Sequence, residues 1–94
     1  MELKPGKFYK IILKCDGYFS QARAKDVKLY ELSEKEKKDF NYEDGINPTH
    51  TLVFYDCSCG VRKEIPGIIE KNDENEIIFA VSKQKKFLIK NLVK

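Results

Sequence analysis

The stretch that decides the fold is residues 51–93, in which four short runs of apolar and β-branched residues are separated by compact turns. The runs are TLVFYDC at 51–57, VRKEIPGII at 61–69, IIFAV at 77–81 and FLIKNLV at 87–93. Runs of this length and spacing are typical of strands in a small curled sheet. A chain of 94 residues has room for one hydrophobic core. We therefore predict a single β-rich domain over residues 1–94.

The N-terminal half predicts further strands and one helix. Apolar residues alternate with lysines in residues 7–15, and residues 18–24 can return antiparallel after the Asp16-Gly17 turn. Residues 27–32 are again β-capable, whereas Ser33 and Glu36 have the spacing of a capping box, which begins a helix. The predicted fold is therefore mainly β, with six to seven short strands in a small curled antiparallel sheet or an SH3-like or Sm-like barrel. One short helix is expected near residues 34–40. Because proline cannot donate to a strand ladder, Pro66-Gly67 is expected to interrupt the strand that begins at Val61 or to place it at an edge.

Charge and composition restrict the function classes. The chain has 18 basic and 15 acidic residues, so its net charge of +3 is weak evidence for nucleic acid as the partner. No run approaches the roughly 18 apolar residues of a membrane span, and residues 1–6 lack the apolar part of a signal peptide. Three cysteines, an odd number, fit reduced thiols better than a secreted disulfide framework. We predict a cytoplasmic protein with no membrane partner.

One set of residues has the donor atoms of a metal site, namely Cys15, His50, Cys57 and Cys59. Four such ligands complete a tetrahedral zinc site. In such a site the sulfur atoms of two cysteine ligands lie about 3.8 Å apart. On an extended strand, however, the side chains of a Cys-x-Cys pair lie about 6.6 Å apart. We therefore predict no resident metal or other cofactor and three free thiols, buried or half-buried, since reduced cysteine behaves as a small apolar residue. Zinc binding or a thiol-dependent activity through these four residues is the alternative.

The remaining residues predict no catalytic site. His50 is the one histidine, so every histidine-dependent mechanism would have to use it. The acidic residues of the predicted helix and the following turn show no pattern that predicts a converging carboxylate pair. The five glycines are isolated turn residues and form no phosphate-binding loop. The chain is therefore predicted not to be an enzyme.

The absence of a chemical motif favours a binding module that acts on a protein partner. Such a module would be a small regulator or inhibitor, of the kind that phages and mobile elements encode, or a subunit of a larger assembly. A module of this kind docks through a strand edge or an apolar patch. The candidate partner-binding residues are Tyr18, Phe19, Asp44, His50 and Pro66. Self-association through strand edges remains open.

Binding of RNA or single-stranded DNA is the alternative function. Small barrels that bind single strands combine lysines and arginines with aromatic side chains on which bases stack. The candidate residues are a lysine-rich C-terminal turn and its expected neighbours, Arg62, Lys63, Lys83, Lys85, Lys86 and Lys90. This alternative predicts that substitution of those lysines weakens binding to oligonucleotides.

Overall fold

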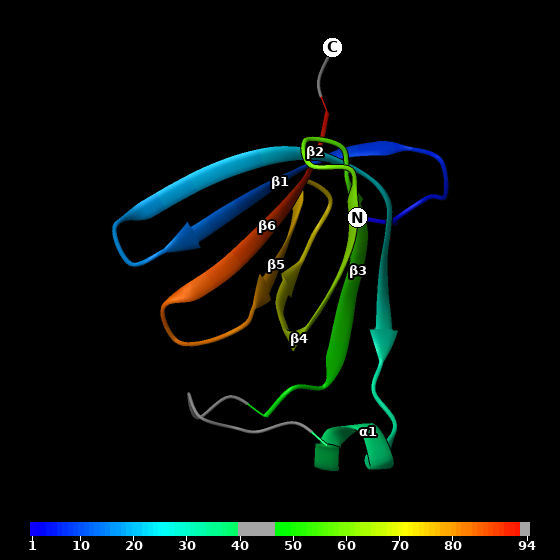
Figure 1. The fold of residues 1–94 in the computed structure, drawn as a ribbon, viewed down its shortest axis with the longest axis vertical. Helices are drawn as coiled ribbons and strands as arrows, with labels where there is room; N and C mark the ends of the chain where they lie inside the picture. Colours follow the sequence, from blue (N-terminus) through cyan, green and yellow to red (C-terminus); the bar gives the residue numbers. More distant parts are fainter. Residues whose placement is uncertain (40–46, 93–94) are drawn as a thin grey trace.

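The computed structural model describes residues 1–39 and 47–92, and these residues form one closed antiparallel barrel of six strands (Figure 1). The strands follow one another around the barrel in chain order, and β6 closes it by pairing with β1. Their bounds are β1 Phe8–Cys15, β2 Tyr18–Glu31, β3 His50–Asp56, β4 Val61–Asn72, β5 Glu76–Ala80 and β6 Lys85–Asn91. The predicted small, mainly β barrel is confirmed.

The short helix α1, Glu34–Asp39, lies between β2 and β3. It begins with the predicted capping box: Glu36 N donates to Ser33 Oγ at 3.2 Å, and Ser33 N donates to a Glu36 carboxylate oxygen at 3.2 Å. These two bonds satisfy amides that a helix start leaves without partners. The end of the predicted helix, at residue 40, lies outside the described residues, as does most of the connection that follows.

The hairpin between β1 and β2 forms at the predicted turn. Cys15 lies opposite Tyr18, and Gly17 adopts a φ of +79°, which glycine reaches without steric cost. From there β2 continues as one strand of 14 residues. Two separate segments were expected, divided at residues 25–26, but the chain instead forms a bulge there, with Asp26 at a φ of +53°. A bulge adds a residue and bends the strand without ending it.

The expected interruption of β4 at Pro66-Gly67 is wrong. This strand runs without a break from Val61 to Asn72 and pairs with β3 through Gly67 and with β5 from Ile68. Pro66 is half-buried, pairs with Thr51 of β3 and lies just before the change of partner. β4 is therefore a strand that joins two neighbours, and Pro66 does not mark the edge of a sheet.

Alternating side chains from all six strands fill the barrel. The interior contains Tyr9 and Ile11 from β1, Leu52 and Phe54 from β3, and residues of the other strands. The fully buried side chains of largest volume are Tyr9, Phe79, Leu52, Ile77, Ile89 and Val27. The alternating sequence of β3 predicts that Leu52, Phe54 and Asp56 share one side of the strand, and all three are buried. Val53, between Leu52 and Phe54, is buried as well. Among the described residues, Asp56 is the one charged residue that is buried.

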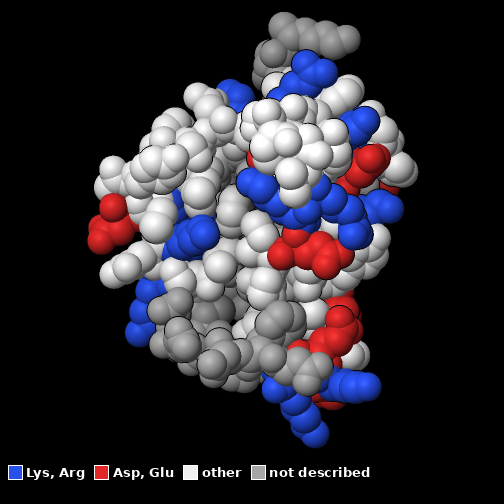
Figure 2. Space-filling model, viewed as in Figure 1, with Lys and Arg blue, Asp and Glu red and all other residues white. Residues whose placement is uncertain are grey.

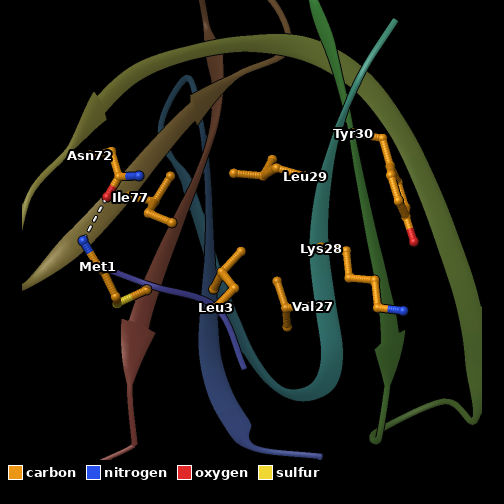
Figure 3. Close-up of a pocket in the computed structure, with 8 residues that line it drawn as sticks. All are labelled: Met1, Leu3, Val27, Lys28, Leu29, Tyr30, Asn72 and Ile77. Carbon is orange, nitrogen blue, oxygen red and sulfur yellow. Dashed lines mark hydrogen bonds between the residues drawn. The ribbon is translucent and has the colours of Figure 1, made fainter. Parts of the chain in front are cut away.

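The N-terminal segment packs against one end of the barrel. Met1 and Leu3 contact the core, and the Met1 amino group donates to Asn72 Oδ1 at 2.8 Å. Lys4 N donates to the Tyr9 hydroxyl at 2.9 Å, and this hydroxyl donates to the Glu2 carbonyl oxygen at 3.3 Å. An open cavity of about 320 Å³ remains beside this segment, with Val27 and Leu29 pointing into it and Lys28 and Tyr30 on the other side of β2 (Figure 3). Within residues 1–39 and 47–92, no helix has the length and apolar character to cross a membrane.

Candidate functional site

The first residues of β2 have a neighbouring strand on one side only. Residues 18–25 of β2 pair with β1, but pairing with β3 begins at Ala24, which lies opposite Asp56. The chain turns away after that point, and Cys57 N makes its hydrogen bond to the Arg23 carbonyl oxygen at 2.9 Å. Residues 18–22, which we name the β2 edge, therefore have no second strand beside them among the described residues. In Figure 1 this part of β2 is the outer strand of the hairpin that projects to the left.

The β2 edge is uncharged and exposed. Its sequence is YFSQA, in a chain of which 35% is charged. The side chains of Tyr18 and Phe19 are 60% and 56% exposed, the two largest values among the exposed large apolar residues described. Proteins usually protect such edges with lysines, prolines or bulges, because an open edge is a template for another strand. The first five residues of β2 have none of these protections.

A lysine-rich turn lies next to this hairpin. Asp16 N donates to the Gln84 carbonyl oxygen at 3.2 Å, and the strands continue this contact with Cys15 opposite Lys85 and Lys14 opposite Lys86. The hairpin and the turn after β5 thus bring residues of two predicted sets to one end of the barrel. Tyr18 and Phe19 come from the predicted protein-binding set. Lys83, Lys85 and Lys86 come from the predicted nucleic-acid set.

The other basic residues of the predicted nucleic-acid set lie elsewhere, in contact with carboxylates. Arg62 and Lys63, near the start of β4, pair with Glu64 at 2.8 Å and with Asp56 at 3.2 Å. Lys90 in β6 lies 3.8 Å from Glu76. Within the lysine-rich turn, Lys86 also has a carboxylate partner, Glu70 at 2.9 Å. The six residues therefore do not form one continuous basic surface.

Two of the other predicted protein-binding residues, His50 and Pro66, lie apart from Tyr18 and Phe19. His50 begins β3 opposite Gly67, and its Nδ1 atom lies 2.8 Å from Thr49 Oγ1. Pro66 lies beside that pair, within β4. Asp44 lies outside the described residues. Of the four candidate residues that the structure describes, Tyr18 and Phe19 lie together on the β2 edge.

The four candidate zinc ligands are not brought together. His50 begins β3 and Cys57 follows its last residue, so the strand, at about 3.3 Å a residue, separates them by roughly 20 Å. Cys15 is half-buried at the end of β1. No group of three or more metal-ligating side chains occurs in the part of the chain that the structure describes. The expectation of buried or half-buried thiols is wrong for Cys57 and Cys59, which are exposed in the turn between β3 and β4.

Asp56 holds this turn at the end of β3. Its carboxylate accepts hydrogen bonds from Ser58 Oγ at 2.6 Å and Ser58 N at 2.9 Å, and Lys63 Nζ lies 3.2 Å away. Burial opposes the ionised form, but the bonds from Ser58 and the charge of Lys63 outweigh it and lower the pKa of Asp56 to about 2. The carboxylate is thus ionised near neutral pH, and its bonds hold the turn in place.

The structure brings together a second group of candidate functional residues that the sequence did not predict. Phe8, Lys10, Arg23 and Lys25 face outward on β1 and β2, next to Tyr55 of β3. Their proximity depends on strand register, for which the sequence has no local signal. The β2 edge did have one, a run of five uncharged residues directly after a hairpin turn.

Comparison of the chain with protein-family models, with curated proteins and with solved structures finds no match.

Proposed function

We propose that this chain is a non-enzymatic protein-binding module that accepts an extended segment of a partner protein as an added strand on the β2 edge. The observation that carries the proposal is the combination of a strand edge with no neighbouring strand among the described residues, no charged residue in five, and two large exposed aromatic side chains. A regulator or inhibitor of a cytoplasmic protein, or a subunit of an assembly, would act in this way.

Strand addition uses the groups that this edge leaves available. Five residues at about 3.3 Å each give an edge of about 16 Å, which accommodates a short segment. Backbone hydrogen bonds supply affinity in this mode, and alternate side chains supply selectivity. Tyr18, Ser20 and Ala22 would flank the added strand on one side, and Phe19 and Gln21 on the other. Tyr18 supplies the type of side chain that often dominates binding energy at interfaces.

The side chains of the β2 edge suggest the character of the partner segment. Tyr18 and Phe19 are large and exposed, and residues 18–22 carry no charge. The nearest exposed charges are of both signs, with Lys14 opposite Phe19 and Asp16 in the turn before Tyr18. These two charges favour neither sign in the partner. We therefore propose an apolar segment as the bound element.

The two glutamines of the chain provide a matched test. Gln21 lies on the β2 edge, and Gln84 lies in the neighbouring turn, where its carbonyl oxygen accepts the bond from Asp16 N. A lysine on an edge opposes the approach of another strand. The protein that co-purifies with the tagged chain from its own cell would be purified, and its affinity measured for the unchanged chain, Gln21→Lys and Gln84→Lys. Hydrogen exchange would be recorded with and without the partner.

We expect Gln21→Lys to weaken binding by about tenfold or more, Gln84→Lys to change it less than about twofold, and the partner to slow amide exchange in residues 18–22. Equal effects of the two substitutions, or protection confined to another strand, would contradict the proposal. A molar mass of two chains in the absence of the partner, with protection of residues 18–22, would also contradict it, since the edge would then serve self-association.

A further inference from the structure

We infer that the outer face of strands β1 to β4 is a second binding site, which takes single-stranded nucleic acid. Register places four outward-facing residues side by side on four neighbouring strands, since Phe8 lies opposite Lys25, Lys25 opposite Tyr55, and Tyr55 opposite Arg62. Direct cross-strand neighbours share one face of a sheet. Aromatic and basic side chains therefore alternate along this row. The proposal does not depend on the β2 edge.

A second row of cations adjoins the first. Lys10 lies opposite Arg23 on one side and opposite Lys90 on the other. Arg23 reaches from this row to Phe8 of the first, with its guanidinium carbon 4.2 Å from the ring centre, and Lys25 Nζ lies 5.1 Å from the ring centre of Tyr55. Both arginines of the chain thus lie on this face. We name it the basic aromatic face, defined by Phe8, Lys10, Arg23, Lys25, Tyr55 and Arg62.

Among the described residues, part of this face has positive charge without a carboxylate in an ion pair. Arg62 is paired with Glu64, but no ion pair of Lys10, Arg23 or Lys25 occurs in the described ranges 1–39 and 47–92. Asp26 follows Lys25, and its carboxylate accepts a bond from Gly6 N at 3.3 Å. Figure 2 shows lysine and arginine side chains gathered around the end of β3 and the adjoining parts of β2 and β4, with carboxylates beside them. A hollow of about 220 Å³ lies next to Lys10 and Arg23.

Single-stranded nucleic acid matches both components of this face. Phosphates would bind Lys10, Arg23 and Lys25, and arginine suits phosphate because its donors form a fork. The bases of a single strand are free to stack on Tyr55 and Phe8, whereas the bases of a duplex already stack on one another. An acidic peptide would bind the cations but would make no use of stacking on the two rings, which contact Arg23 and Lys25. The alternation of rings and cations therefore favours a single strand over either competitor.

The test measures fluorescence anisotropy with labelled oligo-dT and oligo-U of about 15 nucleotides at low salt. We expect a Kd of about 100 µM or tighter for at least one of them. The double variant Arg23→Ala with Lys25→Ala should bind about tenfold more weakly. The charge-matched control, Lys83→Ala with Lys85→Ala at the other end of the barrel, should change Kd less than about twofold. Equal losses in the two double variants would show a response to net charge alone and would overturn the site.

Stacking and salt dependence provide separate readouts. Tyr55→Leu should weaken binding at least fivefold or so, whereas Tyr55→Phe, which keeps the ring, should not. Three phosphate contacts predict a slope of log K against log salt of about −2. In the Arg23 and Lys25 double variant the slope should be shallower by about 1.4. Tighter binding to a duplex or to poly-glutamate, or no binding by the unchanged chain, would overturn the proposal. Gln21→Lys should leave oligonucleotide affinity undiminished, so failure here is distinguishable from failure at the β2 edge.

Discussion

Gly67 of β4 lies so close to Ala80 of β5 that a methyl group at Gly67 would overlap the Ala80 carbonyl oxygen. The same methyl group would lie 2.6 Å from a carbon of the Phe79 ring. Gly67 is buried at the point where β4 exchanges β3 for β5. The absence of a side chain therefore allows the two strands to meet at the change of partner.

Replacement of this glycine should disturb the barrel. Gly67→Ala is expected to lower the free energy of unfolding by about 3 kcal/mol, because the added carbon meets backbone and a buried ring that cannot move freely. Urea denaturation measures the change. Gly17→Ala is the control, since space is open around Gly17 and the loss there, from its positive φ alone, should be nearer 1 kcal/mol. A Gly67→Ala protein as stable as the unchanged chain would refute the close approach.

Asp56 should make stability depend on pH under acid conditions. Its pKa in the folded chain is about 2, below the value near 3.9 of an unfolded aspartate. Ionised Asp56 therefore stabilises the fold above pH 4, and this contribution disappears as the pH falls towards 2. Between pH 5 and 2 the unchanged chain should lose about 2 kcal/mol more than Asp56→Asn.

Urea denaturation at several pH values compares the two proteins. Asp73, whose pKa is also lowered to about 2 by bonds from Asn75 N, Glu76 N and Lys71, titrates in both and cancels in the comparison. Parallel pH profiles would show that Asp56 is not held by Ser58 and Lys63.

The buried Tyr9 hydroxyl should hold the N-terminal segment. Tyr9→Phe removes the bonds to Lys4 N and the Glu2 carbonyl oxygen and should cost about 1 kcal/mol. Amide exchange in residues 2–4 should accelerate more than exchange in β3. Tyr30→Phe, at a residue 48% exposed, is the control and should change neither quantity. Equal exchange rates in Tyr9→Phe and the unchanged chain would contradict this role.

Accessibility predicts the order in which the thiols react. Cys57 and Cys59 are exposed and Cys15 is half-buried. Titration of the folded chain with a thiol reagent should show two fast equivalents and one slow equivalent, because reaction requires an accessible thiolate. Cys15→Ser should remove the slow phase. A single fast equivalent would indicate that the turn between β3 and β4 is covered.

The sequence predicted the features that depend on neighbouring residues. The Asp16-Gly17 turn, the alternation of Leu52, Phe54 and Asp56, and the Ser33 capping box each follow a local rule and are present in the structure. Passage of β4 through Pro66-Gly67 was not predicted, since it depends on the approach of Ala80 from another strand. A tertiary contact here overrode a local breaker signal.

Only part of the candidate site could be predicted from neighbouring residues in the sequence. Tyr18 and Phe19 were identified because two large apolar residues directly follow a turn. The extent of the β2 edge depends on where β3 begins to pair, and the basic aromatic face depends on the register that places Phe8 beside Lys25 and Tyr55. The uncharged run at residues 18–22 is a local signal for the edge, but its extent and the grouping of the basic aromatic face depend on which strands pair, which no single window of sequence encodes.

The pairing of β1 with β6 has a consequence for how the chain folds. The other strand pairs join consecutive segments, whereas Tyr9 meets Asn91 only after a very long loop has closed. Hairpins can therefore assemble early, with this seam completed last. A sheet in which β1 and β6 have not yet paired would have two additional unprotected edges, and such a form would be prone to aggregate. Changes that weaken the seam should thus reduce refolding yield at high protein concentration before they affect the finished barrel.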